Sequence, residues 1–137
     1  DEEISYPALS GRGWDVPEPW SGVEPLPAGF APGDFLVGRL RCGRDLAPSA
    51  AAELRAAGVA AVIATSIAPD FFAAAVAAGL PAVAIEEAAA IKSGDRLRLD
   101  IETFRVANRN SGDRYIIKNL SEAALDALRR ASVAQGA

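Results

Sequence analysis

The chain has 137 residues and a formal net charge of −4, with 14 lysines and arginines against 18 aspartates and glutamates. It contains no histidine and one cysteine, Cys42, which excludes an internal disulfide, a Cys/His zinc site, a set of cluster-ligating cysteines and a Ser-His triad within this chain. The arginines are scattered without a visible basic patch, no apolar run reaches the length of a membrane helix, and the Asp-Glu-Glu start lacks the basic end of a signal peptide. We therefore expect one compact cytoplasmic domain that binds neither nucleic acid nor a membrane.

Residues 1–33 form a proline-rich segment. They hold six of the nine prolines together with Trp14 and Trp20, a composition that resists the interiors of helices and sheets. We expect an extended N-terminal arm laid over the core, with a partly disordered tail as the alternative. Residues 34–137 are then predicted to form the α/β domain.

The first predicted core strand lies between Asp34 and Arg41, where the sequence Phe-Leu-Val-Gly-Arg-Leu is mostly apolar. A loop follows with the sequence Cys42-Gly43-Arg44-Asp45. A helix is then predicted to begin near Pro48, because its fixed φ suits a first helical turn, and to end at Gly58.

Two near-copies of one pattern occupy the centre of the chain, at residues 56–64 and 77–85. Each consists of a helix end, a glycine that can adopt the left-handed C-terminal position, and a short apolar run. Apolar strands between helices are typical of parallel sheets covered on both faces, so residues 61–64 and 82–85 are predicted to be adjacent, parallel and buried. The helix between them is predicted to take Ser66 as its N-cap.

The spacing of apolar residues along the sequence changes in the last third of the chain. Apolar and charged residues alternate over residues 97–101, which indicates a half-buried strand. Two further strands, near residues 104–107 and 115–118, are predicted to complete an antiparallel meander. A last helix is predicted to begin at Ser121 and to continue to about Ala131.

Three passages of the chain carry a family resemblance. Residues 61–72, Ala-Val-Ile-Ala-Thr-Ser-Ile-Ala-Pro-Asp-Phe-Phe, are similar to a family pattern Ala-Val-Ile-Ala-Pro-Ser-Phe-Ala-Arg-Ile-Phe, and residues 79–81 to its Gly-Leu-(Leu)-Pro. Residues 94–100, with Asn108 and residues 111–115, are similar to its Gly-Asp-x-Leu-x-Val-Asp and its hairpin Asn-x-Thr-Thr-Gly-Glu-x-Tyr. The family that these passages resemble is the small subunit of isopropylmalate isomerase (3-isopropylmalate dehydratase), the swivel domain of the aconitase superfamily.

The resemblance extends from about residue 34 to residue 130 and implies an aconitase swivel-type α/β domain. Such a domain has a parallel βαβ core, helices on both faces, and a C-terminal antiparallel hairpin and helix. The implied function is the small subunit of a hydro-lyase, a dehydratase or isomerase that acts on a hydroxy-carboxylic acid. In that hetero-oligomer a large dehydratase subunit bears an iron–sulfur cluster, so we expect no cofactor on this chain and no activity of the chain alone. The arm and the loop at residues 42–45 are expected at the interface.

The chain departs from the family in the loop after the first core strand. There the family carries Gly-Cys-Gly-Ser-Ser-Arg-Glu-His, in which the resemblance implies a serine base and an arginine that binds a substrate carboxylate. Residues 41–48 read Arg-Cys-Gly-Arg-Asp-Leu-Ala-Pro instead. In one register Arg44 takes the place of the arginine, whereas in the other register that position falls on Ala47. No serine base is present in either register, so no catalytic residue is predicted. The candidate substrate-binding residues are Cys42, Gly43, Arg44 and Asp45.

Two alternatives to this function remain open. The chain could be a non-catalytic or repurposed swivel-domain protein that binds a partner or an anionic metabolite, or an enzyme that uses the scaffold for cluster-free chemistry. Arg44 could be a solvated loop arginine paired with Asp45, and Cys42 a small buried residue at a strand end. Asp70 and the pair Glu86-Glu87 could act as general acids only if burial raised their pKa values.

Overall fold

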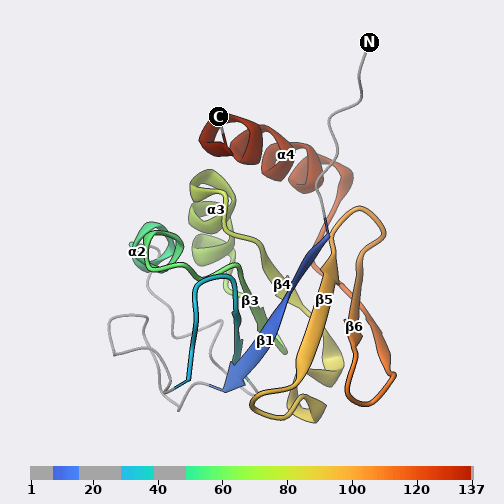
Figure 1. Cartoon of the computed structure of the whole chain (residues 1–137). Coiled ribbons are helices and arrows are strands. Elements are labelled where there is room, and N and C mark those ends of the chain that lie inside the picture. The colour runs from blue at the N-terminus through green and yellow to red at the C-terminus, as the bar shows by residue number, and fades with distance from the viewer. Residues whose placement is uncertain (1–7, 16–28, 39–48, 137) are drawn as a thin grey trace.

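The computed structural model describes residues 8–15, 29–38 and 49–136. Within these residues it contains one seven-stranded sheet with the strand order β4-β3-β2-β1-β5-β6-β7 (Figure 1). The strands are Leu9–Asp15 (β1), Phe35–Gly38 (β2), Ala61–Ala64 (β3), Ala82–Ala84 (β4), Arg96–Asp100 (β5), Arg105–Asn108 (β6) and Arg114–Ile116 (β7). The helices are Ala50–Ala56 (α2), Pro69–Ala78 (α3) and Glu122–Gly136 (α4), and Glu86–Ala90 forms a 3-10 helix (η1).

The parallel half of the sheet consists of β1 to β4. In its register Val62 of β3 lies opposite Ala82 of β4, and Ile63 lies opposite Val83. Every residue of β3 and β4 is buried. The prediction of two adjacent, parallel and buried strands is therefore confirmed, although β4 ends at Ala84, one residue earlier than predicted.

Successive residues of the parallel strands face two different hydrophobic cores. Leu36 and Val62 belong to the core under α2 and α3, which pack along one face of the sheet (Figure 1). Phe35 and Ile63 belong to the opposite core, which also contains buried residues of η1, α4 and the antiparallel strands. Helical elements thus cover both faces of these strands, which is why the strands are apolar on both sides.

β1 lies in the middle of the sheet, within the segment that the sequence predicted as an arm. It pairs in parallel with β2 and antiparallel with β5. Composition did not reveal the strand, because β1 contains two glycines, which have low strand propensity. The packing explains one of them, since a Cβ at Gly13 would lie 2.7 Å from Cδ1 of Leu97 and 2.9 Å from Cγ2 of Val37. Of the predicted arm, residues 1–7 and 16–28 lie outside the described residues.

The antiparallel half follows the predicted meander. β5 pairs with β6 and β6 with β7, and α4 completes the chain. Ser121 caps α4 as predicted, because its side-chain oxygen accepts the backbone N–H of Ala124 at 3.2 Å. The helix continues to Gly136, past the predicted end. Arg129 therefore lies inside the helix, where its guanidinium forms an ion pair with Glu102 and ties α4 to the turn between β5 and β6.

The segment after β7 connects the two edges of the sheet. Lys118 donates its backbone N–H to the carbonyl of Ala84 at 2.8 Å. The side chain of Asn119 accepts the N–H of Ala84 at 2.8 Å and donates to the carbonyl of Ala82 at 3.0 Å. Backbone N–H and carbonyl groups of the edge strand β4 are thereby hydrogen-bonded. The sheet curves as a half-barrel around the core that contains η1 and α4.

Candidate functional site

The carboxyl ends of the four parallel strands lie at one edge of the sheet. β1 pairs with β2, β2 with β3 and β3 with β4, all in parallel, so the four strands share one direction. Ligands of open α/β sheets bind outside the carboxyl ends of the strands, because the loops that follow the strands meet there. We take the surface beyond these carboxyl ends as the candidate functional site and call it the candidate edge. It is distinct from the edge strands β4 and β7.

The predicted substrate-binding residues follow β2 in the chain. Cys42, Gly43, Arg44 and Asp45 lie outside the described residues, within the undescribed range 39–48. β2 itself ends at the candidate edge with Gly38. Their role therefore stays a prediction from the sequence.

Ser66 lies just after β3, and its predicted role as the N-cap of α3 is wrong. α3 begins at Pro69, the N-cap position belongs to Ala68, and no side chain caps the first turn. Proline suits the first helical position because it has no N–H to satisfy, so the helix begins three residues after Ser66. The half-buried Ser66 is left at the candidate edge, in a passage that carries the family resemblance.

The described carboxylates near this edge are exposed. Asp70 lies in the first turn of α3, and Glu86 and Glu87 begin η1. Glu86 forms an ion pair with Lys118, with 2.5 Å between its Oε1 and the lysine Nζ. These three carboxylates are not buried, so the condition set for a general-acid role is not met.

A polar network joins two of the passages that carry the family resemblance, residues 94–100 and Asn108 with residues 111–115. The side-chain amide of Asn108 donates to Oδ2 of Asp95 at 2.9 Å, and Asn108 is only 2% exposed. Its side-chain oxygen accepts the backbone N–H groups of Asn110 at 2.9 Å and Ser111 at 3.3 Å. The same carboxylate oxygen of Asp95 accepts the N–H of Lys92 at 2.9 Å. These residues hold two turns of the antiparallel half together, and their contacts give them a structural role.

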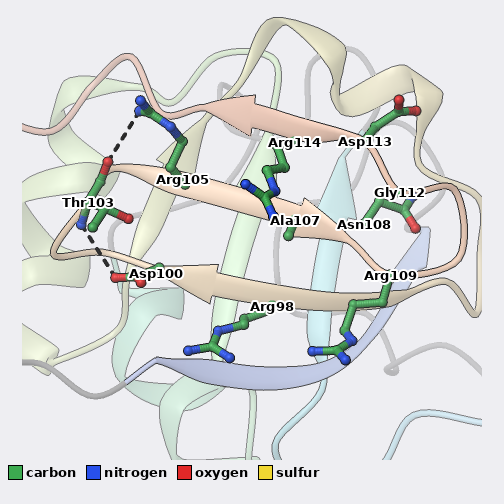
Figure 2. A pocket seen from close by; sticks show the side chains of 10 residues that line it. All are labelled: Arg98, Asp100, Thr103, Arg105, Ala107, Asn108, Arg109, Gly112, Asp113 and Arg114. Atoms are coloured by element: carbon green, nitrogen blue, oxygen red, sulfur yellow. Dashed lines mark hydrogen bonds between the residues drawn. The ribbon is translucent and has the colours of Figure 1, made fainter.

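A basic surface covers the outer face of the antiparallel half, and the expectation that no basic patch exists is wrong. Four arginines line a shallow hollow of about 560 Å³ (Figure 2), and two more line a neighbouring hollow that shares Arg109 with the first. Side chains two residues apart on a strand share a face, so strand pairing gathers arginines that are scattered in the sequence. We call this surface the arginine face; it comprises Arg12, Arg96, Arg98, Arg105, Arg109 and Arg114.

Among the described residues, no group of side chains fits a metal ion. Residues 8–15, 29–38 and 49–136 contain no group of three His, Cys, Asp or Glu side chains that could hold a metal ion. One cysteine in the whole sequence cannot supply the thiolates that a cluster needs. In the same described residues, no helix has both the length and the apolar character that a bilayer span requires.

Comparison with known proteins finds several relatives that are small subunits of dehydratases or isomerases. Over 119 residues the chain is 33% identical to the 3-isopropylmalate dehydratase small subunit of Wolinella succinogenes, a match that spans 78% of this chain and 70% of the relative. The chain belongs to the 3-isopropylmalate dehydratase small-subunit family. Small subunit 2 of the Archaeoglobus fulgidus enzyme is 41% identical over 103 residues, which cover 72% of this chain and 60% of that family member. The chain thus spans less than two thirds of some family members.

The fold of the family is also found among solved structures. A crystal structure of 3-isopropylmalate dehydratase from Methanocaldococcus jannaschii has a TM-score of 0.70 to this chain at 18% identity, and the match covers 94% of this chain and 98% of the other. At this identity the similarity shows the fold alone, and it confirms the predicted swivel-type α/β architecture. No family model matches the chain.

Proposed function

We propose that this chain is the small subunit of a 3-isopropylmalate dehydratase-type hydro-lyase, which removes water from a hydroxy-carboxylic acid. The observation that carries the proposal is the match to the W. succinogenes small subunit over 70% of that protein's length. A further relative, from M. jannaschii, is named isopropylmalate/citramalate isomerase small subunit and is 33% identical over 99 residues, 68% of this chain and 57% of the relative. That name favours hydroxy-dicarboxylates as the substrate class.

A large subunit is proposed to carry the iron–sulfur cluster and most of the chemistry. Dehydration needs a base that takes a proton from carbon and a group that accepts the hydroxide leaving the neighbouring carbon. The sequence lacks the serine pair that the family resemblance implies, and the described carboxylates near the strand ends are exposed. We therefore assign the chemical step to the partner and the orientation of the substrate to this chain.

Arg44 is the residue proposed to contact a substrate carboxylate. It follows β2, whose carboxyl end lies at the candidate edge, and one register of the family motif places it on the carboxylate-binding arginine. A guanidinium can bind a carboxylate through two parallel hydrogen bonds, which fixes the orientation of the acid as well as its position.

The proposal is tested by reconstitution. The full chain is expressed with a large dehydratase subunit, purified without oxygen, and assayed for dehydration of 3-isopropylmalate by the ultraviolet absorbance of the unsaturated diacid. The W. succinogenes small subunit with its own large subunit is the positive control. We expect activity from the complex and none from the chain alone. Arg44→Ala in the complex should raise KM by about tenfold or more, because a charge-assisted contact contributes about 1.5–3 kcal/mol.

The missing serine pair also favours a second candidate, a non-catalytic or repurposed swivel-domain protein. A complex that assembles and shows the absorbance of its cluster, yet does not turn over 3-isopropylmalate or citramalate, would favour this candidate. Failure to assemble with any large subunit would remove the hydro-lyase proposal altogether.

A further inference from the structure

The pairing of the strands β1, β5, β6 and β7 brings the arginines of the arginine face together. Arg98 of β5 lies opposite Ala107 of β6, and Ala107 lies opposite Arg114 of β7. Ala107 of β6 therefore separates the two arginines in one row across the sheet, in which the backbones of β5 and β7 lie about 10 Å apart. Its small side chain forms the floor of the hollow, which Arg105 and Arg109 flank along the chain (Figure 2).

The charges of this surface are not balanced by the described residues. None of the six arginines forms an ion pair with a described carboxylate. Asp100 and Asp113 are the acidic residues among those that line the hollow with four arginines, in a chain whose total charge is −4. Asp34 in the neighbouring hollow accepts hydrogen bonds from Trp14 and from two backbone N–H groups, so it serves the fold.

The arrangement of the guanidinium groups leaves most of them available. In Figure 2 Arg114 extends over Ala107, and Arg98 and Arg109 both extend toward β1. Arg105 donates to the backbone carbonyl of Thr103 at 3.2 Å. Six positive charges gathered on one face give it a positive potential, which favours a bound anion.

Protection of the sheet edge does not account for the arrangement. Charged side chains on an edge strand prevent pairing with other chains. Of the strands that carry this face, only β7 is an edge of the sheet, whereas Arg98 and Arg105 stand on the inner strands β5 and β6. The chain also uses arginine in preference to lysine throughout, so it is the clustering of the arginines that calls for an explanation.

We propose that the hollow around Ala107 binds a small anion that carries phosphate groups. Phosphate presents several oxygens in different directions, so guanidinium groups from β5, β6 and β7 can bind it at the same time, whereas a planar carboxylate offers two oxygens. Four arginines against two carboxylates suit an anion with about two or more negative charges, such as a phosphate monoester or pyrophosphate. The proposal does not depend on the dehydratase function.

The test is calorimetric titration of the full chain at low salt with inorganic pyrophosphate, and with citrate as a carboxylate of comparable charge. We expect pyrophosphate to bind more tightly than citrate. The double variant Arg98→Glu with Arg114→Glu should weaken pyrophosphate binding by about tenfold or more. The control Arg130→Glu changes an exposed arginine of α4 outside the face and should leave the affinity within about twofold.

Charge-conserving variants separate phosphate recognition from a general attraction of anions to a basic surface. Arg98→Lys with Arg114→Lys keeps the charge and the fold of an exposed face but loses bidentate geometry, so an intermediate affinity is expected. Circular dichroism of each variant checks that it is folded. Absence of pyrophosphate binding by the wild type, equal affinity of the double glutamate variant, or preference for citrate would overturn the proposal. Binding of a single-stranded oligonucleotide that tightens with its length, with none of pyrophosphate, would replace it with a nucleic-acid surface.

Discussion

The side chain of Asn119 forms a hydrogen bond with the backbone of Ala84, as a neighbouring strand would. Its oxygen accepts the backbone N–H of Ala84 at 2.8 Å, while its amide donates to the carbonyl of Ala82 at 3.0 Å. One asparagine thereby supplies both kinds of hydrogen bond to the β4 edge. The contact also fixes the path of the chain from β7 to α4, which packs over the curved inner face of the sheet.

Replacing Asn119 with Ala should lower the free energy of unfolding by about 1–3 kcal/mol. The reason is that a partly buried N–H and a carbonyl of β4 would lose their partners. Urea denaturation measures the change. Lys118→Ala is the matched control, because it removes only an exposed ion pair with Glu86 and should cost less than about 1 kcal/mol. Equal losses in the two variants would show that the asparagine contact contributes little.

Asn108→Ala should also be strongly destabilising, by about 2–3 kcal/mol. The substitution leaves Asp95 and two backbone N–H groups of the turn without their buried partner. The control is Lys92→Ala, since the Lys92 side chain is exposed and its contact with Asp95 comes from the backbone. A loss below about 0.5 kcal/mol for Asn108→Ala, similar to surface substitutions, would contradict the structural role assigned to the network.

Gly58 and Gly112 provide a matched pair for testing the end of the first helix–glycine–strand unit. Both have positive φ, +100° and +82°, so alanine is strained at either site. A Cβ at Gly58 would lie 2.9 Å from Cβ of Pro32, whereas nothing lies within 4 Å at Gly112. Gly58→Ala should therefore cost about 1–3 kcal/mol more than Gly112→Ala in a denaturation series. Equal costs would mean that Pro32 moves aside freely.

Tyr115 makes the stability depend on pH in the alkaline range. Burial, and next the nearby Asp113 carboxylate, raises the pKa of Tyr115 above 10.0. The folded state then holds the phenol proton more tightly than the unfolded state, so this stabilisation is complete below the unfolded pKa and is lost as pH rises through the folded pKa. Tyr115→Phe should show a smaller loss of stability between about pH 9 and pH 11 than the wild type. Parallel pH profiles of the two proteins would contradict the prediction.

The sequence by itself determined the elements whose signals are local. Glycine after an apolar helix end and a short apolar run predicted β3 and β4 because both faces of these strands are buried. The alternation at residues 97–101 predicted β5, since one face of that strand is exposed. Ser121 was identified as a helix cap because the hydrogen bond that it accepts spans only three residues.

The tertiary structure alone decided what depends on residues distant in the chain. β1 is a strand because β2 and β5 pair with it from both sides, and its Gly13 is required by contacts with Leu97 and Val37 rather than by any local preference. Ser66 failed as a predicted cap because Pro69 competed with it for the helix start. For the candidate site, the sequence predicted the loop at residues 42–45, which lies outside the described residues, whereas strand direction placed Ser66 at the carboxyl ends of the parallel strands. The arginine face exists because strand pairing brings side chains more than 80 positions apart onto one surface, which no pattern along the sequence reports.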